Sequence, residues 1–294
     1  MKKADIKTGF VCNNNCVFCV QAHKKKFGDK DTKELKRIIR EASKNCDYVT
    51  FTGGEPTIRK DILELVAFAK NCKFKTIQIQ SNGRMFAYEN FCKEMVSVGA
   101  NEFALAIHGH TEELHNYLTQ AVSFKQVVSG VKNLKKMKQR IIINTVICKS
   151  NYRHLPEIAK FMIALDVDQF QFAFIHALGS AKENFDAVVP RISLVIPYLR
   201  KAIDIAKKFK KKIMVEAIPP CLLPGNEDVI SEASMPDITI FDLDRVVADF
   251  KKARLVDGKL KAKKCQKCRH YTTCEGMWRE YPETFGWSEI KPIK

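Results

Sequence analysis

Short apolar runs alternate with amphipathic stretches over the first two thirds of the chain. Runs rich in β-branched and aromatic residues predict strands over 7–11, 47–52, 75–80, 102–107, 140–147 and 168–175. Between them, apolar residues three or four positions apart predict helices near 31–43, 58–70, 86–97, 123–138, 152–164 and 191–210. Such strand–helix repeats form a parallel sheet with right-handed crossovers.

Six repeats are too few to close an eight-stranded barrel. The pattern therefore predicts an α/β fold, a partial (β/α)6 TIM-like barrel, to which residues 213–218 would add one more strand. Parallel barrels place their active sites at the C-terminal ends of the strands. Side chains that directly follow the predicted strands are thus the first candidates for function.

The strand–helix rhythm stops near residue 216. A loop rich in proline follows, and Asp257–Gly258 predicts a hairpin turn. We therefore expect a barrel domain over 1–216 and a small cysteine-rich iron–sulfur domain over 217–294.

The composition is that of a globular protein with an adequate core, since 46% of the 294 residues are hydrophobic. No apolar run is long enough to span a membrane, and no secretory signal begins the chain, so we expect a cytoplasmic protein. The net charge of +17 fits either lysines dispersed over solvent-facing helix positions or attraction to an acidic partner such as RNA. The spread of lysine over all helices favours dispersal.

Eleven cysteines are many for a cytoplasmic protein, and an odd number argues against a disulfide framework. Three crowd the N-terminal region and three the C-terminal region, which is typical of metal sites. Cys46, Cys72, Cys92 and Cys148 fit buried apolar thiols.

The N-terminal group is Cys12, Cys16 and Cys19, placed directly after the first predicted strand. Three thiolates on a short loop can ligate three irons of a four-iron cluster and leave the fourth iron open for catalysis. The alternative is a structural zinc ion, with His23 as the fourth ligand.

The C-x3-C-x2-C spacing, with Phe18 just before the last cysteine, resembles the signature of the radical S-adenosylmethionine (SAM) superfamily. In that family the open iron binds the amino and carboxylate groups of SAM. Reductive cleavage of SAM then gives a 5′-deoxyadenosyl radical that abstracts hydrogen from a substrate. The protein orients the reactants and excludes water.

A second match ends the next predicted strand, where Gly53, Gly54, Glu55 and Pro56 resemble the motif that binds the SAM amino group in this family. Glycines let the backbone approach a ligand closely, and a carboxylate suits an ammonium group. By itself this segment also fits an ordinary strand–helix turn.

Weaker matches follow the later strands. Ser81 and Asn82 are similar to the segment near the SAM ribose, although a helix-cap turn fits as well. His108 is a candidate for substrate or SAM contact, whereas His110 and His115 are expected on the surface. The fifth strand region offers four further SAM contacts, not all of which can point inward: Asn144, Thr145, Asn151 and Arg153.

The C-terminal group is Cys265, Cys268 and Cys274. Its spacing resembles part of the SPASM and twitch extensions of radical SAM enzymes, which implies one auxiliary [4Fe–4S] cluster for electron relay or substrate binding. Cys221 is the expected fourth ligand; otherwise the fourth iron meets substrate. The alternative is zinc, completed by Cys221 or His270.

The sequence thus predicts a radical SAM enzyme that acts on a small molecule or a peptide. Its cofactors would be SAM, a SAM-binding [4Fe–4S] cluster and an auxiliary [4Fe–4S] cluster, and its reductant a low-potential donor of the flavodoxin or ferredoxin type. One rival is a radical SAM enzyme that modifies RNA. The other is a zinc module that binds nucleic acid and has no enzymatic activity.

Overall fold

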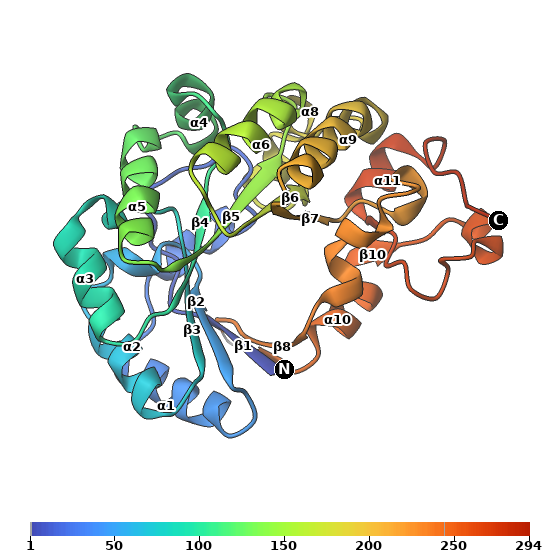
Figure 1. The fold of residues 1–294 in the computed structure, drawn as a ribbon. Helices are drawn as coiled ribbons and strands as arrows, with labels where there is room; N and C mark the ends of the chain where they lie inside the picture. The colour runs from blue at the N-terminus through green and yellow to red at the C-terminus, as the bar shows by residue number, and fades with distance from the viewer. Residues whose placement is uncertain (1, 244) are drawn as a thin grey trace.

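A computed structural model describes residues 2–243 and 245–294, and its centre is a nine-stranded sheet (Figure 1). The strand order is β7-β6-β5-β4-β3-β2-β1-β8-β9. The strands are Lys2–Lys7 (β1), Tyr48–Thr52 (β2), Thr76–Ser81 (β3), Glu102–Ala106 (β4), Arg140–Ile147 (β5), Gln169–Phe174 (β6), Lys212–Glu216 (β7), Asp237–Phe241 (β8) and Val246–Val247 (β9).

Strands β1 to β7 are parallel and follow one another in chain order, which confirms the α/β partial barrel. The expected extra strand is present as β7. Helices cover the outer face of the sheet (Figure 1). The longer ones are Thr32–Ser43 (α1), Ile62–Asn71 (α2), Glu89–Ser97 (α3), Glu112–Thr119 (α4), Phe124–Lys136 (α5), Leu155–Ala164 (α6) and Ile192–Lys208 (α9).

The first strand lies earlier than predicted, over Lys2–Lys7 rather than 7–11. Ala4 and Ile6 are buried on its outer face, while charged residues alternate with them on the inner face. This run therefore resembles a polar segment in the sequence. The expected residues 8–11 instead form the start of the loop that carries the first cysteines.

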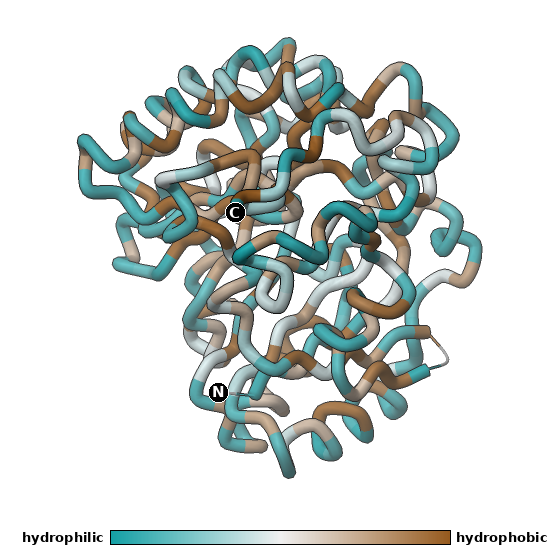
Figure 2. The backbone as a smooth tube through the Cα atoms, turned by 90° about the vertical axis from the view of Figure 1, so that its right-hand side faces the viewer, coloured by the Kyte–Doolittle hydropathy of each residue, from teal (hydrophilic) through white to brown (hydrophobic). Residues whose placement is uncertain are grey.

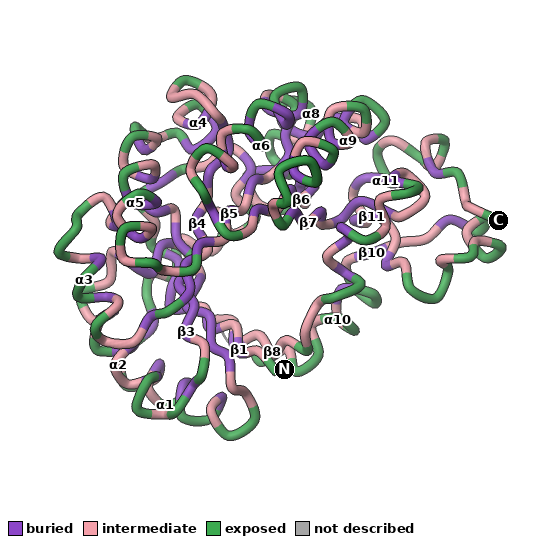
Figure 3. Tube along the Cα trace, viewed as in Figure 1, coloured by how far each residue is buried: buried purple, intermediate pink, exposed green. Residues whose placement is uncertain are grey.

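The same alternation continues across the sheet. On β5 and β6 the outward side chains are buried, and the inward ones are partly accessible (Figure 3). Several inward residues, such as Asn144 and Gln171, are polar. The barrel lumen is therefore a polar space beneath the loops that follow the strands.

Residues beyond 216 partly rejoin the barrel, because β8 pairs in parallel with β1. The rest forms a C-terminal lobe, residues 250–294, beside the open sheet (Figure 1). The lobe holds Phe250–Ala253 (α10), Lys259–Leu260 (β10), Met277–Trp278 (β11) and Glu280–Phe285 (α11). Tyr281 fastens it to α9 by accepting a hydrogen bond from the Ile192 amide over 2.7 Å.

The predicted hairpin at Asp257–Gly258 is wrong. Residues Arg254–Gly258 form a π-helical turn, and β10 pairs with β11, which lies beyond the last three cysteines. Leu255 and Val256, just before Asp257, are exposed, whereas Leu260 on the other side belongs to β10 and lines the cavity of the cysteines described below. None of the helices in the described residues is long and apolar enough to cross a membrane.

Candidate active site

The N-terminal cysteines lie on the loop that leads from β1 across the mouth of the barrel. All three are partly buried and free of disulfides. Burial, followed by the charges of Cys19 and Cys12, raises the pKa of Cys16 to about 12, and burial likewise raises the pKa of Cys12. Thiols that influence one another in this way lie close together, as ligands of one cluster must.

Helix α4 and the fourth strand hold this loop in place. The amides of Asn15 and Val17 donate to the carbonyl oxygens of Thr119 and Leu118 over 3.0 and 3.1 Å. Phe18 is buried and meets the His108 ring edge-to-face, with 4.7 Å between ring centroids. Phe18 therefore anchors the loop that presents the cysteines.

The glycines after β2 allow close packing against the same loop. A Cβ atom on Gly53 would lie 2.2 Å from the Gly9 carbonyl oxygen, and one on Gly54 would lie 2.2 Å from that of Val11. The amides of Gly54 and Glu55 donate to these two carbonyls over 2.9 and 2.8 Å. The two glycines thus allow the backbone of the cysteine loop to pack directly against the end of β2.

Glu55 points inward rather than toward solvent and is 3% exposed. One carboxylate oxygen accepts hydrogen bonds from the Thr57 amide, the Thr57 hydroxyl and the Ser81 hydroxyl, at 3.0, 2.5 and 2.8 Å. The other accepts from the Asn82 amide at 2.6 Å. Burial raises the pKa of Glu55, and these donors oppose that shift. Its side chain ties the end of β2 to the end of β3, and Pro56, also buried, begins the 3-10 turn Pro56–Ile58.

Asn82 extends this connection to the cysteine loop, because its side-chain Nδ2 donates a hydrogen bond to Asn13 Oδ1 over 2.6 Å. Sequence reasoning missed two cations that also hold the loop. Arg84 donates to the Asn13 carbonyl over 2.5 Å, and Lys25 donates to the Asn14 carbonyl over 2.9 Å. Arg84 also donates to Asn14 Oδ1 and Lys25 to Asn15 Oδ1, and no local motif marks either cation.

The four candidate SAM contacts near β5 differ in where their side chains point and in what they bind. Asn144 lies on the lumen face, and its Oδ1 is buried with no hydrogen-bond partner in the described residues. Thr145 faces the other way and donates to the Ile107 carbonyl over 2.5 Å. Asn151 is buried and donates to the carbonyls of His108 and Val146. Arg153 is exposed and contacts the Tyr152 ring and hydroxyl. Asn144 is therefore the member of this set with a free acceptor toward the lumen.

Two of the three histidines after β4, His108 and His115, are buried. His108 is buried, and its Nδ1 accepts from the Val146 amide over 3.2 Å; burial lowers its pKa to about 3. The surface role expected for His115 is wrong: it is 1% exposed, its Nδ1 accepts from the His108 amide, and burial lowers its pKa to about 4. His110 is half-buried. His115 packs against the rings of His108 and Phe124, which lie outside α4, so no local pattern in the sequence marks its burial.

The C-terminal cysteines line one shared pocket, here called the auxiliary cavity. Its other lining residues are mostly apolar or aromatic, among them Met277 and Trp287. Burial, followed by the charges of Cys274 and Cys268, raises the pKa of Cys221 to about 11. The cysteines that line the cavity are Cys221, Cys265, Cys268 and Cys274.

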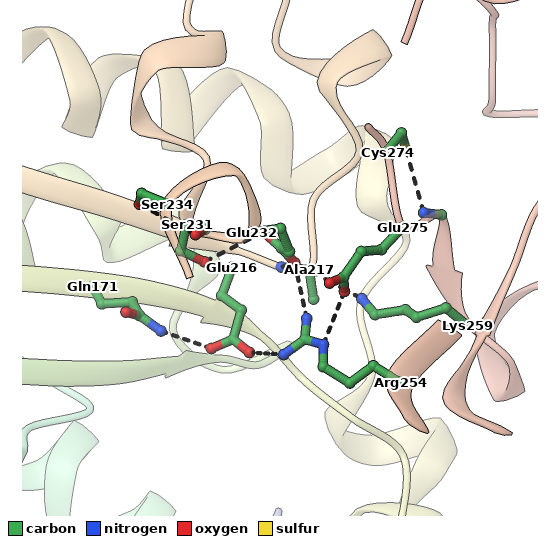
Figure 4. A network of polar contacts seen from close by, with 11 residues as sticks. Gln171, Glu216, Ala217, Ser231, Glu232, Ser234, Arg254, Lys259, Cys274 and Glu275 are labelled. Atoms are coloured by element: carbon green, nitrogen blue, oxygen red, sulfur yellow. Dashed lines mark hydrogen bonds and ion pairs between the residues drawn. The ribbon is translucent and has the colours of Figure 1, made fainter. Parts of the chain in front are cut away.

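A buried charge network, also missed by sequence reasoning, joins this lobe to the barrel (Figure 4). The Arg254 guanidinium contacts Glu216 at the end of β7 over 2.6 Å, Glu232 over 3.1 Å and Glu275 over 2.8 Å. Glu275 directly follows Cys274 in the chain, and Glu216 accepts from Gln171 of the lumen wall over 2.7 Å. The network thus connects the lumen with the wall of the auxiliary cavity.

Both cysteine sets suit iron–sulfur clusters by donor chemistry. Thiolates ligate such clusters, and amide donors to sulfur are present at each site: Asn14 to Cys12 over 3.4 Å and Gly276 to Cys274 over 3.3 Å. A four-iron cluster held by the three thiols at the barrel mouth would keep one iron without a protein ligand. The four thiols at the auxiliary cavity would suffice for all four irons of such a cluster. Among residues 2–243 and 245–294, no group of three or more His, Cys, Asp or Glu is arranged to hold a single metal ion.

Curated relatives share this chain's sequence at a modest level. A probable GTP 3′,8-cyclase of Sulfurisphaera tokodaii is 27% identical over 184 residues, which is 60% of this chain but only 56% of that protein. A probable GTP 3′,8-cyclase of Saccharolobus islandicus is 27% identical over 235 residues, 73% of each chain.

Solved structures share the fold. Streptococcus suis SuiB bound to S-adenosylmethionine matches with a TM-score of 0.68 and 16% identity, over 94% of this chain and 72% of its own. Native anSMEcpe with bound AdoMet matches with a TM-score of 0.69 and 16% identity, over 100% of this chain and 93% of its own. Residues 6–162, more than half of this chain, match the family model of the radical SAM superfamily. This chain therefore belongs to the radical SAM superfamily and is an enzyme.

Proposed function

We propose that Cys12, Cys16 and Cys19 hold a [4Fe–4S] cluster that binds SAM, and that the four cysteines of the auxiliary cavity hold a second. The observation that carries the first part is the joining of three loops at the barrel mouth. The cysteine loop, the Gly53–Glu55 turn and the Ser81–Asn82 turn are hydrogen-bonded to one another. Such a preorganised site fixes a ligand at low entropic cost.

When bound, a cluster of this kind supplies one electron to the sulfonium of SAM, and the resulting radical takes hydrogen from the substrate. The chain's own residues orient SAM and exclude water. Glu55 Oε2 accepts one hydrogen bond, from the Asn82 amide, and keeps a lone pair, so this oxygen and the backbone oxygens of the turn are the groups that we propose bind the SAM ammonium. Asn144 offers its free Oδ1 from the lumen wall.

At the auxiliary cavity, the convergence of four thiols favours electron relay over direct substrate ligation. A cluster with a thiolate on every iron has no open coordination site for substrate. Relay also suits a reaction in which a substrate radical must lose one more electron. We therefore propose an oxidation of a small molecule or a peptide, with the second cluster receiving the extra electron.

Anaerobic metal and sulfide analysis tests both assignments. Protein loaded at both sites should carry about eight irons, by four per thiolate-ligated cluster. It should also form 5′-deoxyadenosine from SAM with dithionite. A zinc content that matches the C-terminal cysteines, with only four irons, would contradict the second assignment and leave the first intact.

The names of the curated relatives favour a second candidate substrate, a nucleoside triphosphate. Adding GTP to the reduced enzyme with SAM tests it. A GTP-dependent rise in 5′-deoxyadenosine, with loss of GTP, would support a nucleotide substrate. No effect of GTP would leave the small molecule or peptide as the substrate to screen.

A further inference from the structure

We propose that the surface around the auxiliary cavity is the docking site of a small acidic electron-carrier protein, which exchanges single electrons with the cluster there. This inference rests on the auxiliary cluster of the proposed function. Figure 2 faces the side of the molecule that bears the C-terminal lobe.

The first argument for this proposal is the positive charge of the C-terminal lobe. Residues 261–271 hold five cationic side chains and no carboxylate, whereas the whole chain has 50 basic and 33 acidic residues. The positive charge is therefore concentrated here beyond the chain average. The five cations are Lys261, Lys263, Lys264, Lys267 and Arg269.

This basic segment forms the rim of the cavity. It includes the 3-10 turn Lys263–Lys267, and the flanking Cys265 and Cys268 line the cavity. Lys263, Lys264, Lys267 and Arg269 are exposed. The chain end adds to the rim, because the Arg269 amide donates to the Ile293 carbonyl over 2.9 Å and Lys291 and Lys294 are exposed.

Little of this charge is neutralised within the chain. Glu227 lies 3.2 Å from Arg269 and 3.9 Å from His270. Lys261 and Lys264 instead donate to the carbonyl oxygens of Tyr271 and Trp287, which fix their direction without cancelling their charge. The rim thus presents a positive field to an approaching anionic surface.

Inside the rim the surface is apolar. Tyr271, 39% exposed, lines the cavity beside Ile290 and Pro292. A small apolar centre within a charged border matches short-lived redox complexes, which bury little area and use charge mainly for orientation and rate. RNA is the other polyanion that such charge attracts, but an electron-relay site beneath the patch favours a redox protein.

The electron balance is simple. The reduced cluster loses one electron, and an oxidised flavin carrier gains it together with one proton from water. A flavodoxin is therefore a suitable probe. The measurement uses full-length protein with Cys12→Ala, Cys16→Ala and Cys19→Ala, so that the auxiliary cluster is the only one loaded. Dithionite reduces this cluster and is removed before the flavodoxin is added.

Charge reversal on the rim tests the proposal. Lys263→Glu, Lys267→Glu and Lys291→Glu together should lower the second-order rate of flavin reduction at least tenfold at low salt, and should flatten its dependence on ionic strength. Lys132→Glu, Lys136→Glu and Lys160→Glu, three exposed lysines on α5 and α6, form the matched control and should leave the rate unchanged. Iron content and the electron paramagnetic resonance signal verify that each variant holds the same cluster.

Equal rates for rim and control variants would overturn the docking site. So would a rim variant that loses salt-dependent binding of an RNA oligonucleotide while flavin reduction stays unchanged. If the rim variant loses its cluster, a second variant with only Lys291→Glu and Lys294→Glu replaces it. Its second-order rate of flavin reduction is then compared with that of the control variant. Failure of the cluster to assemble in the parent protein instead refutes the proposed function, so the two failures are distinguishable.

Discussion

Arg254 Nη1 lies 2.6 Å from Glu216 Oε1, a contact that joins the C-terminal lobe to the end of β7. Both groups belong to the buried network with Glu232 and Glu275 (Figure 4). Replacing Arg254 with Met leaves these carboxylates without their guanidinium. Removing one partner of a buried ion pair costs about 3–5 kcal/mol, and we expect that loss in the free energy of unfolding.

Denaturant unfolding of the anaerobic, loaded protein measures this change. Arg269→Met is the matched control, because Arg269 is exposed and its pair with Glu227 should contribute less than about 1 kcal/mol. Similar losses for the two variants would show that the Arg254 network does not hold the lobe in place.

The second prediction concerns Gly54. An alanine Cβ at this position would lie 2.2 Å from the Val11 carbonyl oxygen, next to Cys12. Gly54→Ala should therefore displace the cysteine loop and remove the N-terminal iron, about half of the total, while the auxiliary iron remains. Gly225→Ala is the control, since a Cβ there meets nothing within 4 Å. Its φ of +83° costs only about 1 kcal/mol of strain. Full iron content in Gly54→Ala would contradict the packing argument.

The third prediction is the loss of SAM cleavage with the N-terminal thiols. The triple variant Cys12→Ala, Cys16→Ala and Cys19→Ala should form no 5′-deoxyadenosine with dithionite, and should keep about half of the iron. Cys221→Ala should instead lose the iron of the auxiliary cavity and keep the N-terminal iron, so that it still cleaves SAM. Normal SAM cleavage by the triple variant would refute the assignment of the SAM-binding cluster.

The fourth prediction concerns pH. Burial lowers the pKa of His108 to about 3 and that of His115 to about 4, below the unfolded value of 6.5. Between these values the unfolded chain binds more protons than the folded one, so stability is present above pH 6.5 and falls as the pH drops below it. Between pH 7 and pH 5, the protonation of each histidine in the unfolded chain should lower the free energy of unfolding by about 2 kcal/mol.

Unfolding measured across this range tests the prediction. His115→Gln should reduce the dependence of stability on pH, whereas His154→Gln, at an exposed position, should leave it unchanged. An unchanged slope in His115→Gln would show that His115 does not supply this proton linkage.

The amino-acid sequence was sufficient to predict the repeating strands and helices, the family and the cysteine sets. Each of these depends on local spacing: apolar alternation within a strand, or thiols and glycines a few residues apart. The local pattern did not predict β1, because lumen-facing Lys3, Asp5 and Lys7 alternate with the buried Ala4 and Ile6 and make the segment look polar. It failed again at Asp257–Gly258, where the pairing partner of β10 lies beyond the cysteines.

The contacts that these residues make depend on the three-dimensional fold. It turned Glu55 inward onto Ser81 and Asn82, buried His115, and brought Cys221 to the same cavity as Cys274. It also built the Arg254 network from carboxylates on three separate segments. Burial and charge pairing arise between segments that are distant in the chain, and no local periodicity records which distant side chains will share one low-dielectric space.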